Sequence, residues 1–354
     1  MIIAADSNIT HGPVRTLVVD DSPLMRNAIQ SMLGKSDHIE VVGTASNGLE
    51  CLQKIRDHRP DVITLDIDMP LMNGISAIKN IMVRHQIPIL IISSLVQDGY
   101  FSFEALRLGV MDFFPKPAQT KQMNALIEEE FLRNRVLTAA GMQVHSMRRV
   151  RLKRKARSLK LSTRKRPKSA VVMGTTLAGP NTIMHIVSDL PEDYGGVIIA
   201  VQEIHPRILV PFCSYFNEIS PLEVVPVTSS QPLLPGKIYI GSTFGGVSVE
   251  EAGNGSDALR IFPAESPHMP IDQLFKSTVR QFRQHTCGVL LTGIGVDGVD
   301  GMAEIKAHGG LTIAQEKSCC PYPNLIENVI ERGTVDLILS TRGIVDRIKS
   351  WTRG

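Results

Sequence analysis

Acidic and basic side chains follow three short apolar segments in the first third of the chain. Asp20 and Asp21 come directly after the first segment, and Asp66 ends the second, just before a loop that contains Pro and Gly. Lys116 follows the third segment. Because parallel strands of an open α/β sheet bring their carboxyl ends to one edge, where ligands bind, these side chains are predicted to share one oxygen-rich cation site.

The residue types in this predicted site suit phosphoryl transfer. Crowded carboxylates repel one another, and Mg2+ relieves that repulsion while keeping waters for a phosphate. Asp66 can attack phosphorus to form an acyl phosphate, Lys116 can pair with the phosphoryl charge, and Ser93 supplies a hydroxyl after another apolar segment. In an alternative interpretation, the two adjacent aspartates only cap the helix that follows them. The order of the four positions along the chain favours the phosphoryl site.

Residues 15–135, which contain these positions, resemble the receiver domain of two-component response regulators. The resemblance implies a flavodoxin-like fold and a chemotaxis histidine kinase as phosphodonor. It also implies that Asp66 is the phosphorylated residue and that Ser93 and Lys116 contact the phosphoryl group. The implied Mg2+ site consists of Asp20, Asp21, Asp66 and the backbone carbonyl of Asp68.

Length and composition indicate more than one globular domain. With 354 residues, the chain exceeds a single core of about 150 residues, and 43% hydrophobic with 21% charged residues is ordinary for soluble proteins. No run approaches the ~20 apolar residues of a membrane span, and the N-terminus lacks a signal-peptide pattern. Five cysteines without a C-x-x-C spacing favour a reducing compartment. We therefore expect a cytoplasmic protein with no transmembrane segment.

A strongly basic segment divides the chain. Residues 141–168 contain twelve of the 38 Lys and Arg residues and no Asp or Glu, so the remainder is acidic overall. Such a composition usually stays solvated and mobile. Binding of nucleic acid or anionic lipid through charge is an alternative, and docking onto the acidic flanking domains is another. Because no aromatic residues are interleaved and no helix-turn-helix follows, we predict a linker over 136–168 and no specific nucleic-acid partner.

An alternation of strands and helices restarts after the linker. Ile183, Ile186, Val187 and Leu190 recur at helical spacing and form one apolar face. Helical stretches between apolar segments favour a largely parallel, doubly wound sheet. The strands are predicted at 170–173, 197–202, 238–240, 289–292 and 311–315. The predicted fold class is α/β with two doubly wound parallel-sheet domains, arranged as a tail (1–14), a first domain (15–135), the linker (136–168) and a second domain (169–352).

Three loops that follow predicted strands of the second domain carry reactive groups. Thr176 puts a hydroxyl on a strand-to-helix turn, where helix amides can stabilise an oxyanion. Glu203 and His205 follow a second strand, and Asp297 lies in a glycine-rich loop after a third. Each loop alone is equally consistent with a structural turn.

In this order, the loops of residues 169–352 resemble the C-terminal domain of the chemotaxis protein-glutamate methylesterases. Supporting stretches are 234–240, 270–277, 290–298 and 312–315. The resemblance implies a hydrolase that demethylates, and often deamidates, glutamyl side chains of chemoreceptors by means of a serine, a histidine and an aspartate. It further implies that phosphorylation of the receiver relieves occlusion of this site and that the domain needs no cofactor.

The catalytic positions of this family are only partly kept. Thr176 stands for the nucleophilic serine of the family's Gly-x-Ser-Thr-Gly-Gly turn, and Ala178 stands for a glycine. Glu203 stands for the histidine, His205 lies two residues later, and Asp297 matches the acid. The threonine methyl group crowds attack, glutamate is a weak base unless burial raises its pKa, and His205 lies about 6.6 Å farther along a continuing strand.

Three hypotheses follow from these observations. The first is a phosphorylation-gated methylesterase or deamidase that uses Thr176, His205 or Glu203, and Asp297. The second is a catalytically impaired or inactive regulator that binds receptors or competes for phosphoryl groups. The third is a DNA- or membrane-binding regulator that acts through the basic linker.

Overall fold

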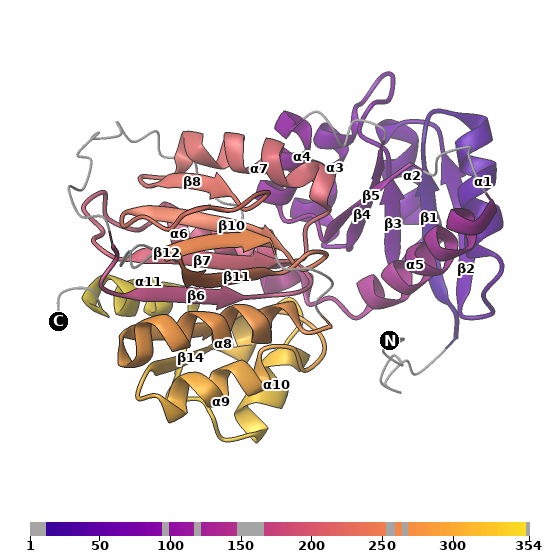
Figure 1. Cartoon of the computed structure of the whole chain (residues 1–354). Coiled ribbons are helices and arrows are strands. Elements are labelled where there is room, and N and C mark those ends of the chain that lie inside the picture. The colour runs from indigo at the N-terminus through magenta and orange to yellow at the C-terminus, as the bar shows by residue number, and fades with distance from the viewer. Residues whose placement is uncertain are drawn as a thin grey trace. The chain divides into compact units, whose positions relative to one another are not determined.

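The computed structural model of the chain describes residues 12–93, 99–116, 122–146, 166–252, 259–263 and 268–351. The chain divides into two compact units, Met1–Arg148 and Arg149–Gly354 (Figure 1). Each unit contains its own main β-sheet. The most basic part of the predicted linker, 147–165, lies outside the described residues.

The first unit is built on a five-stranded sheet in which all strand pairs are parallel. The strand order β2-β1-β3-β4-β5 reverses direction between β1 and β3, which is the switch point where flavodoxin-like sheets bind ligands. Its strands are β1 (Val14–Val19), β2 (Ile39–Ala45), β3 (Val62–Leu65), β4 (Ile89–Ser93) and β5 (Asp112–Pro115). Its helices are α1 (Pro23–Leu33), α2 (Gly48–His58), α3 (Gly74–Arg84), α4 (Gly99–Leu108) and α5 (Gln122–Ala140).

The end of this unit extends farther than the predicted domain boundary at 135. Helix α5 continues to Ala140, and Val136 and Ala139 are fully buried, so the first residues of the predicted linker belong to a packed helix. A short 3-10 turn follows at Val144–Ser146. Apolar residues thus continue the helix until the basic residues begin.

The second unit is built on a seven-stranded sheet, also parallel at every pair. The order is β15-β14-β13-β6-β7-β10-β8, and the order reverses between β6 and β7. Its strands are β6 (Ala170–Gly174), β7 (Val197–Gln202), β8 (Glu223–Pro226), β10 (Lys237–Ser242), β13 (Thr286–Leu290), β14 (Leu311–Gln315) and β15 (Leu337–Leu339). The predicted fold class, two parallel-sheet α/β domains, is confirmed for both units.

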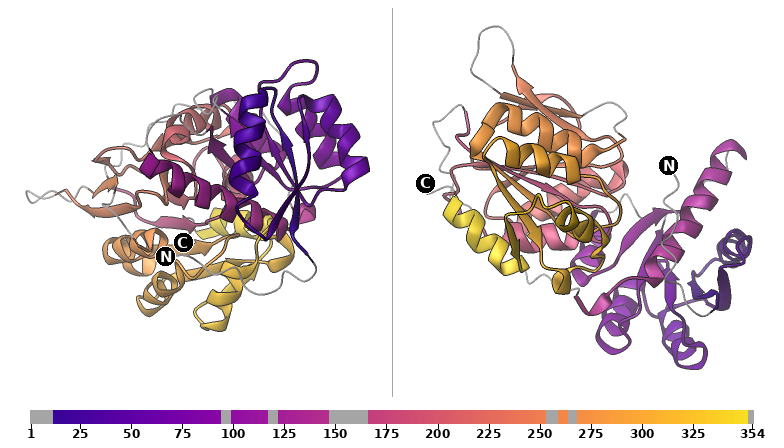
Figure 2. Two further views of the ribbon diagram at one scale, coloured as in Figure 1. Left: turned by 90° about the vertical axis from the view of Figure 1, so that its right-hand side faces the viewer. Right: turned by 90° about the horizontal axis from the view of Figure 1, so that it is seen from below.

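Helices cover both faces of this sheet. On one face, alternate residues of the strands form a buried apolar cluster with residues of α8, α9 and α10. Helices α8 and α9 lie side by side (Figure 2). Helix α11 packs against α6. The helices are α6 (Gly179–Ser188), α7 (Pro206–Ile219), α8 (Pro270–Phe282), α9 (Val299–Ala307), α10 (Asn324–Glu331) and α11 (Thr341–Trp351), with 3-10 turns at Arg283–His285 and Lys317–Cys319.

A small antiparallel sheet, which the sequence pattern did not predict, completes the second unit. It has the order β11-β12-β9, with β9 (Gln231–Pro232), β11 (Val247–Glu251) and β12 (Leu259–Pro263). Val247, Val249 and Ile261 from this sheet join the core cluster beneath α8. The small sheet therefore helps to cover the face on which α8 lies.

Candidate functional site

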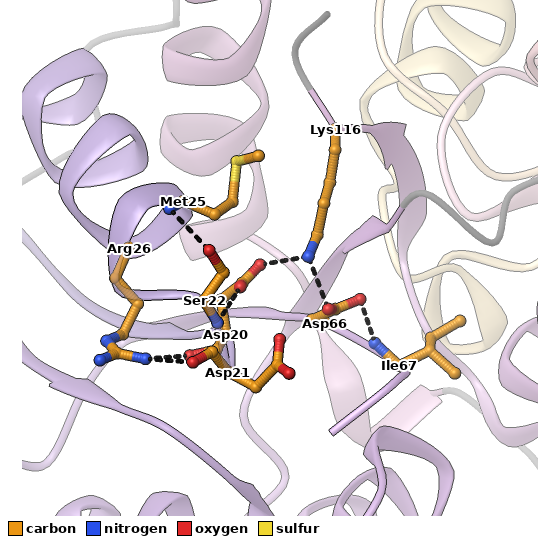
Figure 3. A network of polar contacts seen from close by, with 8 residues as sticks. All are labelled: Asp20, Asp21, Ser22, Met25, Arg26, Asp66, Ile67 and Lys116. Atoms are coloured by element: carbon orange, nitrogen blue, oxygen red, sulfur yellow. Dashed lines mark hydrogen bonds and ion pairs between the residues drawn. The ribbon is translucent and has the colours of Figure 1, made fainter. Parts of the chain in front are cut away.

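The predicted phosphoryl site lies at the switch point of the first sheet. Asp20 follows β1 and is fully buried, Asp66 follows β3 and is 3% exposed, and Lys116 follows β5. The Nζ atom of Lys116 lies 2.6 Å from Oδ2 of Asp66 and 2.7 Å from Oδ2 of Asp20 (Figure 3). The other oxygen of Asp66 accepts a hydrogen bond of 2.7 Å from the backbone N–H of Ile67. Three strands thus bring these charges together.

The acidic groups at this edge have the chemistry of a divalent cation site. One carboxylate oxygen each from Asp20, Asp21 and Asp66 lies within 4.8 Å of the others, and Asp21 is the exposed member. Oxygen ligands of this kind, with an open side toward solvent, fit Mg2+ and its retained waters. The side chain of Asp68 is exposed. The residues that are present therefore fit the implied metal.

Ser22, rather than either aspartate, caps the helix that follows β1. Its Oγ accepts a hydrogen bond of 3.4 Å from the Met25 N–H, and its own N–H donates to Oδ1 of Asp20 at 2.9 Å. The alternative in which the aspartates serve only as helix caps is therefore wrong. The Asp20 carboxylate bridges the loop and Lys116, while Asp21 stays open to solvent.

Burial and pairing shift the titration of the site in a consistent way. Desolvation raises the pKa of Asp20 above its ordinary value, against the opposing effect of Lys116. Burial alone would lower the pKa of Lys116, but its hydrogen bonds to Asp20 and Asp66 outweigh burial and raise it. The ammonium therefore stays charged at neutral pH and compensates for the carboxylates. Ser93 is fully buried beside this lysine, and its carbonyl accepts a hydrogen bond of 3.3 Å from the Lys116 N–H.

In the second unit, the hydroxyl of Thr176 is bound to the glycine-rich loop. Its Oγ1 accepts a hydrogen bond of 2.8 Å from the N–H of Ile294 and donates one of 3.2 Å to the carbonyl of Ile294. The neighbouring Thr175 donates to the carbonyl of Thr292 at 2.6 Å. A Cβ at Gly293 would collide with the Thr176 Oγ1, so this glycine permits the close approach. Thr176 thus acts here as a tether between two loops.

Two asparagines that the sequence analysis did not single out hold the same loop from the other side. Oδ1 of Asn324 accepts a hydrogen bond of 2.9 Å from the Gly295 N–H, and Nδ2 of Asn328 donates to the Gly295 carbonyl at 2.6 Å. Both come from α10 and lie one turn apart. Their i, i+4 spacing was visible in the sequence, but nothing in the sequence indicated what they would face.

Of the two predicted bases, His205 serves as the N-terminal cap of α7. Its Nδ1 accepts a hydrogen bond of 3.2 Å from the Arg207 N–H, which in the neutral imidazole places the proton on Nε2. The ring lies 5.9 Å from that of Phe244, centroid to centroid. Burial and then the nearby Arg207 lower the pKa of His205. Glu203 lies just after β7 and is half-buried.

Asp297 caps a helix with both carboxylate oxygens. Oδ2 accepts from the Ile271 N–H and Oδ1 from the Asp272 N–H, each at 2.9 Å, at the start of α8. In return, Oδ1 of Asp272 accepts from the Gly301 N–H at 2.6 Å, near the start of α9. Asp297, just before α9, therefore caps α8, and Asp272 in α8 caps the start of α9. Desolvation raises the pKa of Asp297 to about 6, despite these hydrogen bonds.

The hydrogen bonds of Thr176, His205 and Asp297 therefore lead to three different parts of the second unit. Within the described residues, no hydrogen bond connects Thr176, His205 and Asp297, because each is engaged with a different partner. Ala178 adopts φ 57° and ψ 17°, a left-handed conformation that a glycine takes without strain.

Both units match known families. Residues 16–128 match the family described as response regulator receiver domain, and residues 171–348 match the CheB methylesterase family. A protein-glutamate methylesterase/protein-glutamine glutaminase of Clostridium acetobutylicum is 32% identical, covering 96% of this chain and 98% of the relative. One from Carboxydothermus hydrogenoformans is 34% identical, covering 96% of this chain and 99% of the relative. The CheB methylesterase catalytic domain of Thermotoga maritima is 26% identical with a TM-score of 0.48, covering 51% of this chain and 97% of that structure.

A receiver at the N-terminus and a methylesterase domain after it define a two-domain response regulator. The chain belongs to the protein-glutamate methylesterase family. The resemblance noted from the sequence is thereby confirmed. None of the helices in the described ranges has the length and apolar character needed to span a bilayer.

Replacing Ala178 by glycine should cost the second unit little stability. The loss of a buried methyl group is offset because relief of the left-handed conformation is worth about 1 kcal/mol or more. The matched control is Ala200→Gly in β7, which loses an equally buried methyl group without such relief. Urea unfolding of the full chain, followed by fluorescence of the single tryptophan, Trp351 in α11, reports on this unit. Equal losses in the two variants would contradict the strained turn.

Asp297→Asn should remove a pH dependence of the second unit. A carboxyl whose pKa is raised in the folded state binds its proton more tightly there than in the unfolded chain. Its contribution to stability is therefore present at low pH and is lost as pH rises from about 4 to about 6, in total on the order of 2–3 kcal/mol. Between about pH 4 and about pH 6, the free energy of unfolding of the asparagine variant should therefore rise relative to that of the wild type. Unfolding is followed by Trp351 fluorescence. A difference between the two proteins that is constant from pH 4 to pH 7 would contradict this origin.

Proposed function

We propose that this protein is a phosphorylation-regulated chemotaxis response regulator whose methylesterase-like domain recognises glutamyl side chains of chemoreceptors but hydrolyses their esters poorly. The observation that carries the second part is the Thr176 hydroxyl, whose hydrogen bonds in the described residues both go to Ile294. A hydroxyl that donates its proton to a backbone carbonyl has no base to activate it. Attack would require this tether to break and a base to approach.

The receiver half of the proposal rests on the geometry at Asp66. A histidine kinase would transfer a phosphoryl group to the Asp66 carboxylate, which breaks the donor's P–N bond and forms an O–P bond. Mg2+ held by Asp20, Asp21 and Asp66 would neutralise charge on the transferring group. Lys116, which now bridges Asp20 and Asp66, is close enough to follow the new phosphoryl oxygens, and Ser93 lies beside it. These roles agree with the charges that the sheet edge brings together.

Turnover by Thr176 is the second candidate, and one observation favours it. Asp297 occupies the family's acidic position and is buried, with its pKa raised to about 6. Under this reading Glu203 or His205 would have to take the threonine proton. Two hydrogen-bonding arrangements oppose this proton transfer. His205 caps α7, and Asp297 caps α8. Both candidate functions place the protein in the cytoplasm, and the five free cysteine thiols support that location.

Asp66→Asn should abolish phosphorylation, because the amide cannot attack phosphorus. Full-length protein would be incubated with Mg2+ and a small-molecule phosphodonor, and the phosphorylated fraction would be read on a phosphate-affinity gel. Asp57→Asn is the control, since that exposed carboxylate lies on α2 and outside the acidic cluster. It should be labelled like the wild type. Labelling that persists in Asp66→Asn would overturn the assignment of the acceptor.

Methanol release from methylated chemoreceptor should not depend on Thr176. We expect the phosphorylated wild type to release methanol within about twofold of Thr176→Ala, because a triad without its base loses several orders of magnitude in rate. A variant that returns the family's residues, Thr176→Ser with Leu177→Thr, Ala178→Gly and Glu203→His, should exceed the wild type at least about tenfold. Wild-type release far above that of Thr176→Ala would establish turnover by the native site instead.

Receptor binding provides the other half of this test. Co-sedimentation with receptor-containing vesicles should be the same for wild type and Thr176→Ala, since recognition does not need the hydroxyl as nucleophile. Vesicles without receptor are the matched control. Failure of the phosphorylated wild type to sediment above that control would remove the receptor-binding function.

A further inference from the structure

Arg26 makes an unusual contact with the backbone of the acidic loop. Its Nη1 donates to the carbonyl of Asp20 at 2.6 Å and to the carbonyl of Asp21 at 3.0 Å (Figure 3). The side chain reaches back from α1 and is half-buried. One guanidinium nitrogen therefore holds two successive peptide groups of the loop that carries two of the three clustered carboxylates.

These two carbonyls belong to the peptide planes on either side of the Asp21 Cα. Fixing both planes fixes the φ and ψ angles of Asp21, and these set the direction in which its side chain leaves the backbone. Asp21 lies between the end of β1 and the start of α1, so neither element fixes its backbone. Its side chain is exposed, in contrast to buried Asp20, and packing constrains it little. The contact with Arg26 is thus a physical means of aiming this carboxylate.

We infer that Arg26 is a positioning residue for the metal site, which orients Asp21 toward the cation and so raises Mg2+ affinity in spite of its own positive charge. The inference rests on the proposal that Mg2+ binds at Asp20, Asp21 and Asp66. The charge and the geometry of Arg26 act in opposite directions. A bare positive charge near the site weakens cation binding, whereas an oriented ligand strengthens it. The sign of a substitution therefore separates the two effects.

Arg26→Gln and Arg26→Lys should each weaken Mg2+ binding about 5- to 10-fold, as measured by calorimetric titration of the full-length protein with MgCl2. Glutamine removes the charge, and lysine keeps the charge but lacks the planar guanidinium that spans both carbonyls. Arg15→Gln is the matched control, since Arg15 also donates to a backbone carbonyl, that of His58 at 2.8 Å, at the opposite end of β1. It should bind Mg2+ like the wild type. Tighter or unchanged binding in Arg26→Gln would overturn the inference.

A measurement without metal keeps the inference separate from the Mg2+ proposal. In Mg2+-free buffer, hydrogen exchange in a peptide that spans residues 19–25 should be faster in Arg26→Gln than in wild type, because the loop loses its anchor. The same peptide in Arg15→Gln should exchange at the wild-type rate. If the wild type binds no Mg2+, the metal proposal fails while faster exchange still supports the anchor. Unchanged exchange in Arg26→Gln would overturn the anchoring role itself.

Discussion

A buried carboxylate must find a partner for its charge, and this requirement organises both functional edges of the protein. In the first unit, Asp20 and Asp66 share the ammonium of Lys116. In the second, Asp297 and Asp272 are satisfied by backbone amides at helix starts. An ammonium on a flexible side chain can move when a phosphoryl group or a metal arrives. Backbone amides in two packed helices cannot, so the contacts of Asp297 and Asp272 fix how α8 and the start of α9 lie against each other.

In the second unit, the side chains predicted to be reactive make hydrogen bonds within the fold. Thr176 and the asparagines Asn324 and Asn328 hold the loop at residues 293–295 from two sides. His205 caps α7. These contacts hold the loops close together, and among the described residues no hydrogen bond joins Thr176, His205 and Asp297.

Much of the architecture could be predicted because it depends on local patterns. The strands at 197–202 and 311–315 have the observed bounds, since apolar residues buried on both faces form continuous runs in a parallel sheet. The strand predicted at 289–292 instead spans Thr286–Leu290, and Thr292 lies beyond its end, where its Oγ1 donates to the Tyr322 carbonyl. The antiparallel sheet of β9, β11 and β12 was not predicted; β9 has only two residues, and β11 and β12 have five each.

By itself, the sequence determined the two α/β domains, the family, and the set of charged groups at the strand ends of the receiver. Strand ends in a parallel sheet meet at one edge, so order along the chain was sufficient for Asp20, Asp66 and Lys116 to be placed together. Only the tertiary structure decided that Ser22 caps α1, that Arg26 holds the acidic loop, and that Asp272 and Asp297 exchange helix caps. It also decided that the Thr176 hydroxyl is hydrogen-bonded to the backbone of Ile294, 118 positions away in the chain. Such hydrogen bonds depend on distances between loops that residue types and spacing do not fix.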